Sequence, residues 1–347
     1  MNHIDLLQSL IKTRSFSREE DGTASLIDDF LKSHGVRTSR YNNNIVAIHP
    51  GYDKEKKTVL LNSHHDTVKV NKGWTRDPFG AIIEDGTLYG LGSNDAGGCL
   101  VSLIWTFIHF YHKPMSFNLI LAATAEEEIF GPLGLSSLID TVLPEIHLGI
   151  IGEPTSLQLG VAEKGLIVID AVVKGKAGHA ARKTGVNAIN ESIEDLQFLK
   201  EFTFPLVSEH LGPVTMQVTQ IESGYQHNII PDECKYVIDI RVNEHYTNQE
   251  IVDTLSQHLK ADLTPRSLRW RSKGIDLSHP IVKTTEKLGI PSFGSPTLSD
   301  QMHCNFPTVK IGPGDSTRSH TPDEHIHLSE IEDGVKTYIS LLDNLEF

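Results

Sequence analysis

The chain has 347 residues, of which 39% are hydrophobic and 22% are charged, a composition typical of globular proteins. Its length allows a large core and about two domains. The formal net charge of −14 argues against nucleic acids and anionic membranes as binding partners. No apolar run approaches the length that crosses a bilayer, so we expect no membrane association.

The cysteines and the N-terminus give no sign of secretion. The three cysteines, Cys99, Cys234 and Cys304, form no CxxC pair, so neither a disulfide framework nor a thiolate zinc site is indicated. The N-terminal residues lack a basic segment followed by an apolar one, as a signal peptide requires. We therefore expect a cytoplasmic protein.

The first elements are two helices and two strands. Apolar residues at helical spacing predict an amphipathic helix over 4–11. Ser15 and Ser17 precede two glutamates, which predicts the N-terminal cap of a second helix. Strands are then expected at 45–49 and 58–62.

Histidine or carboxylate side chains follow the buried strands of this half of the chain. They come after the strands at 58–62, 118–123 and 148–151, and in the loop before a helix over 100–110. The residues are His64 with Asp66, Asp95, Glu127 with Glu128, and Glu153. Because ligands sit outside the carboxyl ends of strands in α/β sheets, we expect these side chains to converge. Imidazole and carboxylate without thiolate suit zinc, cobalt or manganese, and their number indicates two ions sharing a carboxylate.

The glycine-rich loop around Asp95 has another interpretation, which its sequence excludes. Gly90 and Gly92 suggest a dinucleotide-binding loop, but the third glycine of that motif would fall at Asp95. A carboxylate is electrostatically unsuitable where a phosphate would approach. Asp95 can instead cap the following helix, act as a metal ligand, or do both.

The segment 160–272 has a different pattern and predicts an inserted domain. Its expected order is strand, helix, strand, strand, helix, which is typical of a small α+β domain. The flanking parts, 1–159 and 273–347, then form one α/β catalytic domain with a central, mostly parallel sheet. His320 follows a strand near 308–311 and is the natural last ligand. Ser329 and Glu332 predict the capping box of the terminal helix.

In their order along the chain, these motifs resemble the M20 metallopeptidase/deacylase family, over nearly the whole length. The motifs are His64-x-Asp66, Gly92-Ser93-Asn94-Asp95, Glu127-Glu128, Gly152-Glu153-Pro154-Thr155, Gly178-His179, Asn228-Ile229-Ile230-Pro231 and Ser319-His320-Thr321. Within the family, the chain is most similar to the branch that acts on acetylornithine. Some members of that branch are thought to act on succinylornithine instead.

The resemblance implies a zinc-hydrolase fold whose inserted domain serves as a lid and dimerisation domain, so we expect a homodimer. It implies two zinc ions per subunit, for which cobalt can substitute. One ion would be bound by His64 and Glu153 and the other by Glu128 and His320, while Asp95 bridges both.

The resemblance also implies roles beyond the ligands. Asp66 would orient His64, and Glu127 would act as the general base. In similar proteins, the equivalent of His179 reaches into the partner subunit's site and helps to hold the oxyanion. Asn228 and Arg241 resemble positions that bind the substrate and its carboxylate. From the residues alone, Glu127 could be a structural carboxylate, His179 a surface histidine, and Arg241 a partner of acidic neighbours.

We therefore predict a metal-dependent amide hydrolase that removes an acetyl, or a succinyl, group from an N-acylated amino acid such as N-acetylornithine, in arginine biosynthesis. Succinyl-diaminopimelate desuccinylation and di- or aminopeptidase activity are alternatives on the same scaffold. A non-catalytic metal-binding module is an alternative of another class. Two departures leave the substrate open: Ala96-Gly97-Gly98 replaces the more common Met-Lys-Gly, and His65 doubles the histidine.

Overall fold

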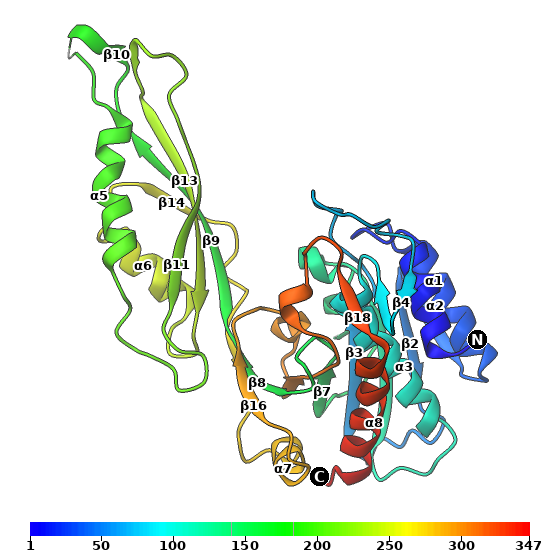
Figure 1. The fold of residues 1–347 in the computed structure, drawn as a ribbon. Helices are drawn as coiled ribbons and strands as arrows, with labels where there is room; N and C mark the ends of the chain where they lie inside the picture. The colour runs from blue at the N-terminus through cyan, green and yellow to red at the C-terminus, as the bar shows by residue number, and fades with distance from the viewer. Residues whose placement is uncertain (140, 183) are drawn as a thin grey trace. The chain divides into compact units, whose positions relative to one another are not determined.

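The computed structural model describes residues 1–139, 141–182 and 184–347, and these residues form two compact units (Figure 1). The first unit comprises Met1–Val161, Ile275–Phe293 and Ser299–Phe347. The second unit comprises Ala162–Gly274 and Gly294–Leu298. Among the described residues, no helix combines the length and the apolar character that crossing a membrane requires.

The first unit contains a large sheet with the strand order β1-β2-β6-β3-β7-β17-β8. The strands are β1 (Thr38–Tyr41), β2 (Asn44–Ile48), β3 (Thr58–His64), β6 (Asn118–Thr124), β7 (Leu148–Ile151), β17 (Thr308–Lys310) and β8 (Leu159–Glu163), the last of which continues into the second unit. The central strands β6, β3, β7 and β17 are parallel to one another. The prediction of an α/β fold with a central, mostly parallel sheet is therefore confirmed.

Both faces of this sheet are covered. Strand β3 shows this, since successive side chains of a strand point to opposite faces. On β3, Val59 and Leu61 belong to a core cluster that includes Phe107 of the helix α3 (Gly98–Phe110). Leu60 belongs to a separate cluster with Leu138. Burial on both faces explains why the central strands carry apolar residues at consecutive positions, as at 59–61 and 119–123.

The remaining helices of the first unit are α1 (His3–Lys12), α2 (Asp21–Ser33), α4 (Ser136–Ile139), α7 (Pro280–Lys287) and α8 (Leu328–Asn344). A small antiparallel sheet contains β4 (Ile82–Glu84), β5 (Thr87–Tyr89) and β18 (His325–His327), which pair in the order β18-β5-β4, and β18 immediately precedes α8 in the chain. Helix α8 packs against α3 (Figure 1).

Two predicted helix caps are wrong. Helix α2 has Glu20 at its N-cap and no side-chain capping bond, because the Ser17 hydroxyl donates to Asp66 instead. Helix α8 begins at Leu328, and its N-cap His327 donates its backbone N–H to Glu330. The predicted capping box at Ser329 and Glu332 was therefore placed two residues too late.

The second unit is built on a four-stranded antiparallel sheet of order β11-β13-β9-β14. Its elements are β9 (Gly165–Lys174), α5 (Ala188–Glu201), β11 (Thr215–Ser223), β13 (Glu233–Val242), α6 (Asn248–Ser256) and β14 (Asp262–Pro265). Buried side chains of β9, β13 and both helices form a core of its own. Two short strands, β10 (Gly178–His179) and β12 (Ile229–Ile230), make a separate antiparallel ribbon. Strands β15 (Lys273–Gly274) and β16 (Ser292–Ser295) pair with β8.

Candidate metal centre

Three neighbouring parallel strands deliver acidic and imidazole side chains to one edge of the large sheet. His64 is the last residue of β3. Glu127 and Glu128 lie in a short 3-10 turn that follows β6, and Glu153 comes two residues after β7. Since β3 pairs with both β6 and β7 in parallel, these side chains meet at the carboxyl ends of the strands, as expected.

Asp95 reaches the same edge from the turn at Ser93–Gly97 that leads into α3. Its Oδ1 lies 3.3 Å from Nε2 of His64, and its Oδ2 lies 3.6 Å from Nε2 of His320. The two carboxylate oxygens therefore face different histidines. A capping role for Asp95 is excluded, because the N-cap of α3 is Gly97, without a side-chain capping bond.

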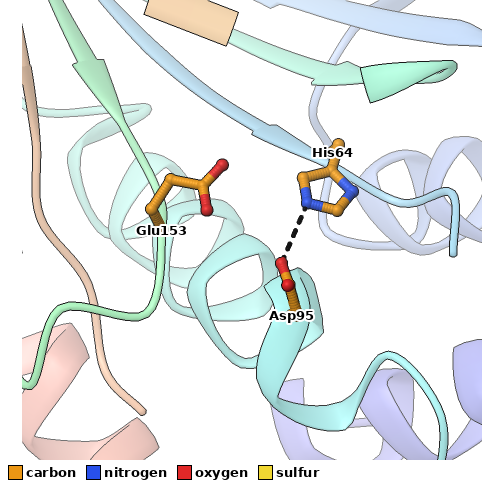
Figure 2. A group of neighbouring side chains, drawn as sticks. All are labelled: His64, Asp95 and Glu153. Carbon is orange, nitrogen blue, oxygen red and sulfur yellow. Dashed lines mark hydrogen bonds and ion pairs between the residues drawn. The ribbon is translucent and has the colours of Figure 1, made fainter. Parts of the chain in front are cut away.

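The ligating atoms form two groups that share Asp95. One group is His64, Asp95 and Glu153, and the other is Asp95, Glu128 and His320; within each, the ligating atoms lie within 4.8 Å of one another. Figure 2 shows the side chains of the first group pointing toward a common space. In the second group, Nε2 of His320 lies 3.0 and 3.1 Å from the two carboxylate oxygens of Glu128.

Asp66 joins the loop of His64 to the loop of the glutamates. Its Oδ1 accepts the backbone N–H of Glu127 at 3.0 Å, and its Oδ2 accepts the backbone N–H of Glu128 at 3.2 Å. Oδ2 also accepts the Ser17 hydroxyl at 2.7 Å. Nδ1 of His64 lies 3.0 Å from the Asp66 carbonyl oxygen and 3.4 Å from its carboxylate. Asp66 thus contacts the His64 ring and also fixes the turn that presents both glutamates.

Several acidic side chains are buried together at this edge, and burial and neighbouring charges shift the pKa values of its groups. Burial and the charge of Asp95 raise the pKa of Glu153 to about 8. Burial raises the pKa of Glu127 well above its usual value, although His64 lowers it. The hydrogen bond with Glu128 raises the pKa of His320 to about 9. For His64, burial lowers the pKa, but the bonds with Asp66 and Asp95 outweigh it and leave the pKa well raised. These carboxyl groups are buried close to one another, and divalent cations bound among them would offset their mutual repulsion.

Glu127 stands beside both groups. It is buried, with 7% of its surface exposed, and its Oε2 lies 3.9 Å from Nε2 of His64. Among the described residues it belongs to neither ligand group. The arrangement therefore leaves a carboxylate next to the candidate ligands that is not needed as a ligand itself.

His65 points away from the groups. Its Nδ1 lies 2.9 Å from the Thr23 hydroxyl, and its Nε2 lies 2.9 Å from the carbonyl oxygen of Asn43. Burial lowers the pKa of His65 to about 4, so the ring is neutral. Its two ring nitrogens serve to hold the β1–β2 turn and α2.

His179, Asn228 and Arg241 belong to the second unit, and the structure describes their surroundings there. His179 is exposed at the end of β10, and Asn228 precedes β12, whose ribbon with β10 brings the two residues together. The Oδ1 atom of Asn228 is buried and has no hydrogen-bond partner among the described residues. The guanidinium of Arg241 donates to both carboxylate oxygens of Asp239, at 2.8 and 3.1 Å.

Two residues that contact this edge were not identified from the sequence as part of the site. Ser17 was interpreted as a helix cap, and its contact with Asp66 spans 49 positions. Glu324 is buried and accepts the backbone N–H groups of the Asp95 turn. Its position four residues after His320 was the available signal, but a lone glutamate in a loop does not show which backbone it binds.

Comparisons with known proteins agree with this geometry. The model of the peptidase family M20/M25/M40 matches residues 60–344. Succinyl-diaminopimelate desuccinylase 2 of Ruegeria sp. (strain TM1040) is 27% identical and covers 94% of this chain and 91% of its own. The acetylornithine deacetylase of Shigella sonnei (strain Ss046) is 29% identical over 93% of this chain and 92% of its own.

Solved structures share the fold at lower identity. An M20 family metallo-carboxypeptidase from Sulfolobus solfataricus has a TM-score of 0.80 and 18% identity, and the match covers 99% of both chains. A dinuclear metal binding peptidase of the M20 family from Bacillus subtilis has a TM-score of 0.74 and 14% identity, over 99% of this chain and 98% of its own.

The chain therefore belongs to the M20 peptidase family, and the predicted resemblance is confirmed. It is a metal-dependent amide hydrolase, in a family that generally binds a dinuclear metal centre. The structure supplies two candidate ligand groups for such a centre.

Proposed function

We propose that His64, Asp95 and Glu153 bind one zinc ion and that Asp95, Glu128 and His320 bind a second, with cobalt as a functional substitute. The observation that carries this proposal is the shared Asp95, whose two oxygens face different histidines at 3.3 and 3.6 Å. Each group offers one imidazole and two carboxylates, a donor set that suits zinc. The buried carboxylates also need the positive charge that two divalent cations provide.

Bound there, the two ions would supply Lewis-acid activation of a water and of the scissile carbonyl. We assign Glu127 as the general base that takes the proton from the attacking water and returns it to the leaving amine. Its support is its burial next to both groups without membership of either.

We propose that the substrate is an N-acylated amino acid, and that the reaction removes its acyl group by amide hydrolysis. Deacetylation of N-acetylornithine, in arginine biosynthesis, is the first candidate, and the 29% identical acetylornithine deacetylase supports it. Removal of a succinyl group is the second candidate, because the succinyl-diaminopimelate desuccinylase is similar at 27% identity over a comparable length.

We propose that residues 160–272 form a lid and dimerisation domain and that the protein acts as a homodimer. In this proposal His179 helps to hold the oxyanion in the partner subunit's site, and Asn228 and Arg241 bind the substrate. The buried Oδ1 of Asn228, without a partner among the described residues, supports a ligand contact there. For Arg241, a substrate carboxylate would compete with Asp239, which already binds its guanidinium.

The experiment is a substrate panel with metal as the second variable. Purified protein is treated with a chelator, reloaded with zinc or cobalt, and assayed for free amine from acetylornithine, succinylornithine, succinyl-diaminopimelate, acetylcitrulline and dipeptides. We expect turnover of one acylated amino acid only in the metal-loaded protein, with two ions bound per chain. Turnover of dipeptides alone would refute the proposed substrate class. Absence of any turnover in protein with two bound ions would favour a non-catalytic metal-binding module.

A further inference from the structure

Glu324 is a buried carboxylate whose hydrogen bonds, among the described residues, come from the turn that presents Asp95. It is 1% exposed. Its Oε1 accepts the backbone N–H groups of Asn94 and Asp95, both at 2.9 Å, and its Oε2 accepts the N–H of Gly92 at 3.1 Å. Successive backbone N–H groups that converge in this way form a concavity for an anion, and here a side chain of the same protein fills it.

The turn needs such support because its backbone is not regular. Gly92 has φ of +76°, where a side chain would be strained, and an added Cβ there would lie 2.6 Å from Cγ2 of Thr67. The backbone angles of Asp95 are −116° and 98°, outside the helical region, although Asp95 lies inside the turn before α3. The N–H groups of Gly92, Asn94 and Asp95 therefore donate to Glu324 rather than to carbonyl groups of a regular helix.

Glu324 also connects the two ligand groups through the chain. It follows His320 by four residues and immediately precedes β18, which pairs with β5. On the other side of the turn, Asn94 exchanges hydrogen bonds with the backbone of Asp315, at 3.0 and 3.1 Å. Asn94 also donates to the Ser319 hydroxyl at 3.3 Å, so the loop that carries His320 holds the Asp95 turn through Asn94 as well as through Glu324.

We propose that Glu324 is a positioning residue that fixes the Gly92–Asp95 turn, so that the two oxygens of Asp95 face both metal sites at once. This inference rests on the metal centre proposed above and extends it to a residue that touches neither ion. Stabilising the fold alone does not require a carboxylate at this place, because burying one beside Asp95 is electrostatically unfavourable. A role in setting the shared ligand explains why a carboxyl group is kept there.

The test compares metal binding by three variants. Glu324→Gln keeps the size of the side chain, but its amide nitrogen cannot accept an N–H, so at least one bond of the turn is lost. Glu324→Asp keeps the charge and is one methylene shorter. Asp323→Asn is the matched control, since Asp323 also accepts bonds from backbone N–H groups, of Thr75 and Arg76, away from the Asp95 turn.

Zinc affinity and stoichiometry are measured by competition with a chromophoric chelator, and the absorption spectrum of the cobalt-loaded protein reports ligand geometry. We expect Glu324→Gln to lower the affinity for both ions about 10–100-fold, as removal of residues that orient metal ligands does in other proteins. The cobalt spectrum of this variant should also change. Glu324→Asp should lose less zinc affinity than Glu324→Gln, and Asp323→Asn should bind zinc as tightly as the wild type. The unfolding midpoint of the metal-free proteins separates a loss of stability from a loss of metal affinity.

The outcomes distinguish this inference from the metal centre itself. Wild-type protein that binds fewer than two ions would refute the centre. Wild-type binding of two ions together with unchanged affinity in Glu324→Gln would refute the role of Glu324, even if that variant unfolds at a lower temperature. If Glu324→Gln does not fold, Glu324→Asp decides the question, because unchanged affinity and an unchanged cobalt spectrum in that variant would overturn the proposal.

Discussion

Replacing Asp66 by Asn should weaken the site through the geometry of two loops rather than through direct loss of a ligand. The carboxylate accepts the N–H groups of Glu127 and Glu128 on different oxygens, and Ser17 donates to the second oxygen. An amide places an NH2 group at one of these positions. Whichever way it is oriented, one backbone N–H of the glutamate turn then faces a donor instead of an acceptor.

The magnitude follows from counting these bonds. A buried N–H left without an acceptor costs about 1–3 kcal/mol. The retained bonds change from a charged to a neutral acceptor, which removes about 1 kcal/mol each. Because the amide avoids the cost of burying a charge, we reduce the sum and expect Asp66→Asn to lower the free energy of unfolding by about 2–4 kcal/mol. Although burial raises the pKa of Asp66, the bond with His64 and the charge of that ring, together with the bonds from Ser17 and Glu127, leave it lowered.

The assay is urea unfolding of the metal-free protein, followed by zinc titration of the same samples. Ser17→Ala is the matched control, because it removes one bond to Asp66 and leaves both N–H groups paired. Ser17→Ala should lower the free energy of unfolding by about 1–2 kcal/mol with little change in zinc affinity. Asp66→Asn should in addition lower the zinc affinity about 10–100-fold. The reasoning is refuted if Asp66→Asn is no less stable than Ser17→Ala, or if its zinc affinity equals that of the wild type.

Three further substitutions test other parts of the structure. Glu127→Gln should reduce kcat by about 100- to 10,000-fold while both ions stay bound; near-normal turnover at full metal content would exclude Glu127 as the base. Gly97→Ala should destabilise the protein by about 1–3 kcal/mol and lower its metal content, because the added Cβ would lie 2.3 Å from the Gly92 carbonyl oxygen. An unchanged melting temperature and unchanged metal content in this variant would contradict the prediction. Tyr236→Phe removes the 2.9 Å bond to Asp195 in the core of the second unit and should lower the free energy of unfolding by about 1–2 kcal/mol. A change in the metal content of this variant would contradict the separation of the two cores.

The convergence of the candidate ligands at one edge was largely predictable from the sequence because of how parallel sheets are built. A buried strand such as β6 is apolar at nearly every position, so the glutamates that follow it mark its end clearly. Parallel neighbours bring such ends to one edge, and this rule places Glu128 and Glu153 near His64 without any knowledge of the coordinates. The rule uses only the direction of the strands, which the sequence pattern indicates.

The partners that hold these ligands could not be predicted in the same way. Ser17 precedes two glutamates and therefore fits a local capping pattern, but its hydroxyl instead binds Asp66, which is distant in the chain. Glu324 binds a turn 229–232 positions away. A serine or a glutamate in a loop has many possible partners, and only the tertiary structure selects one of them. Local patterns also failed at helix α8, where His327 and Glu330 form the N-terminal contact.

The substrate was not predictable for a related reason, which lies in the division of the chain. Every candidate metal ligand and Glu127 belong to the first unit, whereas His179, Asn228 and Arg241 belong to the second. Hydrolysis of an amide makes the same demand on the first set whatever acyl group is removed, and two relatives named for different acyl groups are similarly close to this chain. The residues proposed above to bind the substrate lie in the second unit. Among the described residues there, the buried Oδ1 of Asn228 has no hydrogen-bond partner, whereas the guanidinium of Arg241 is bound by Asp239.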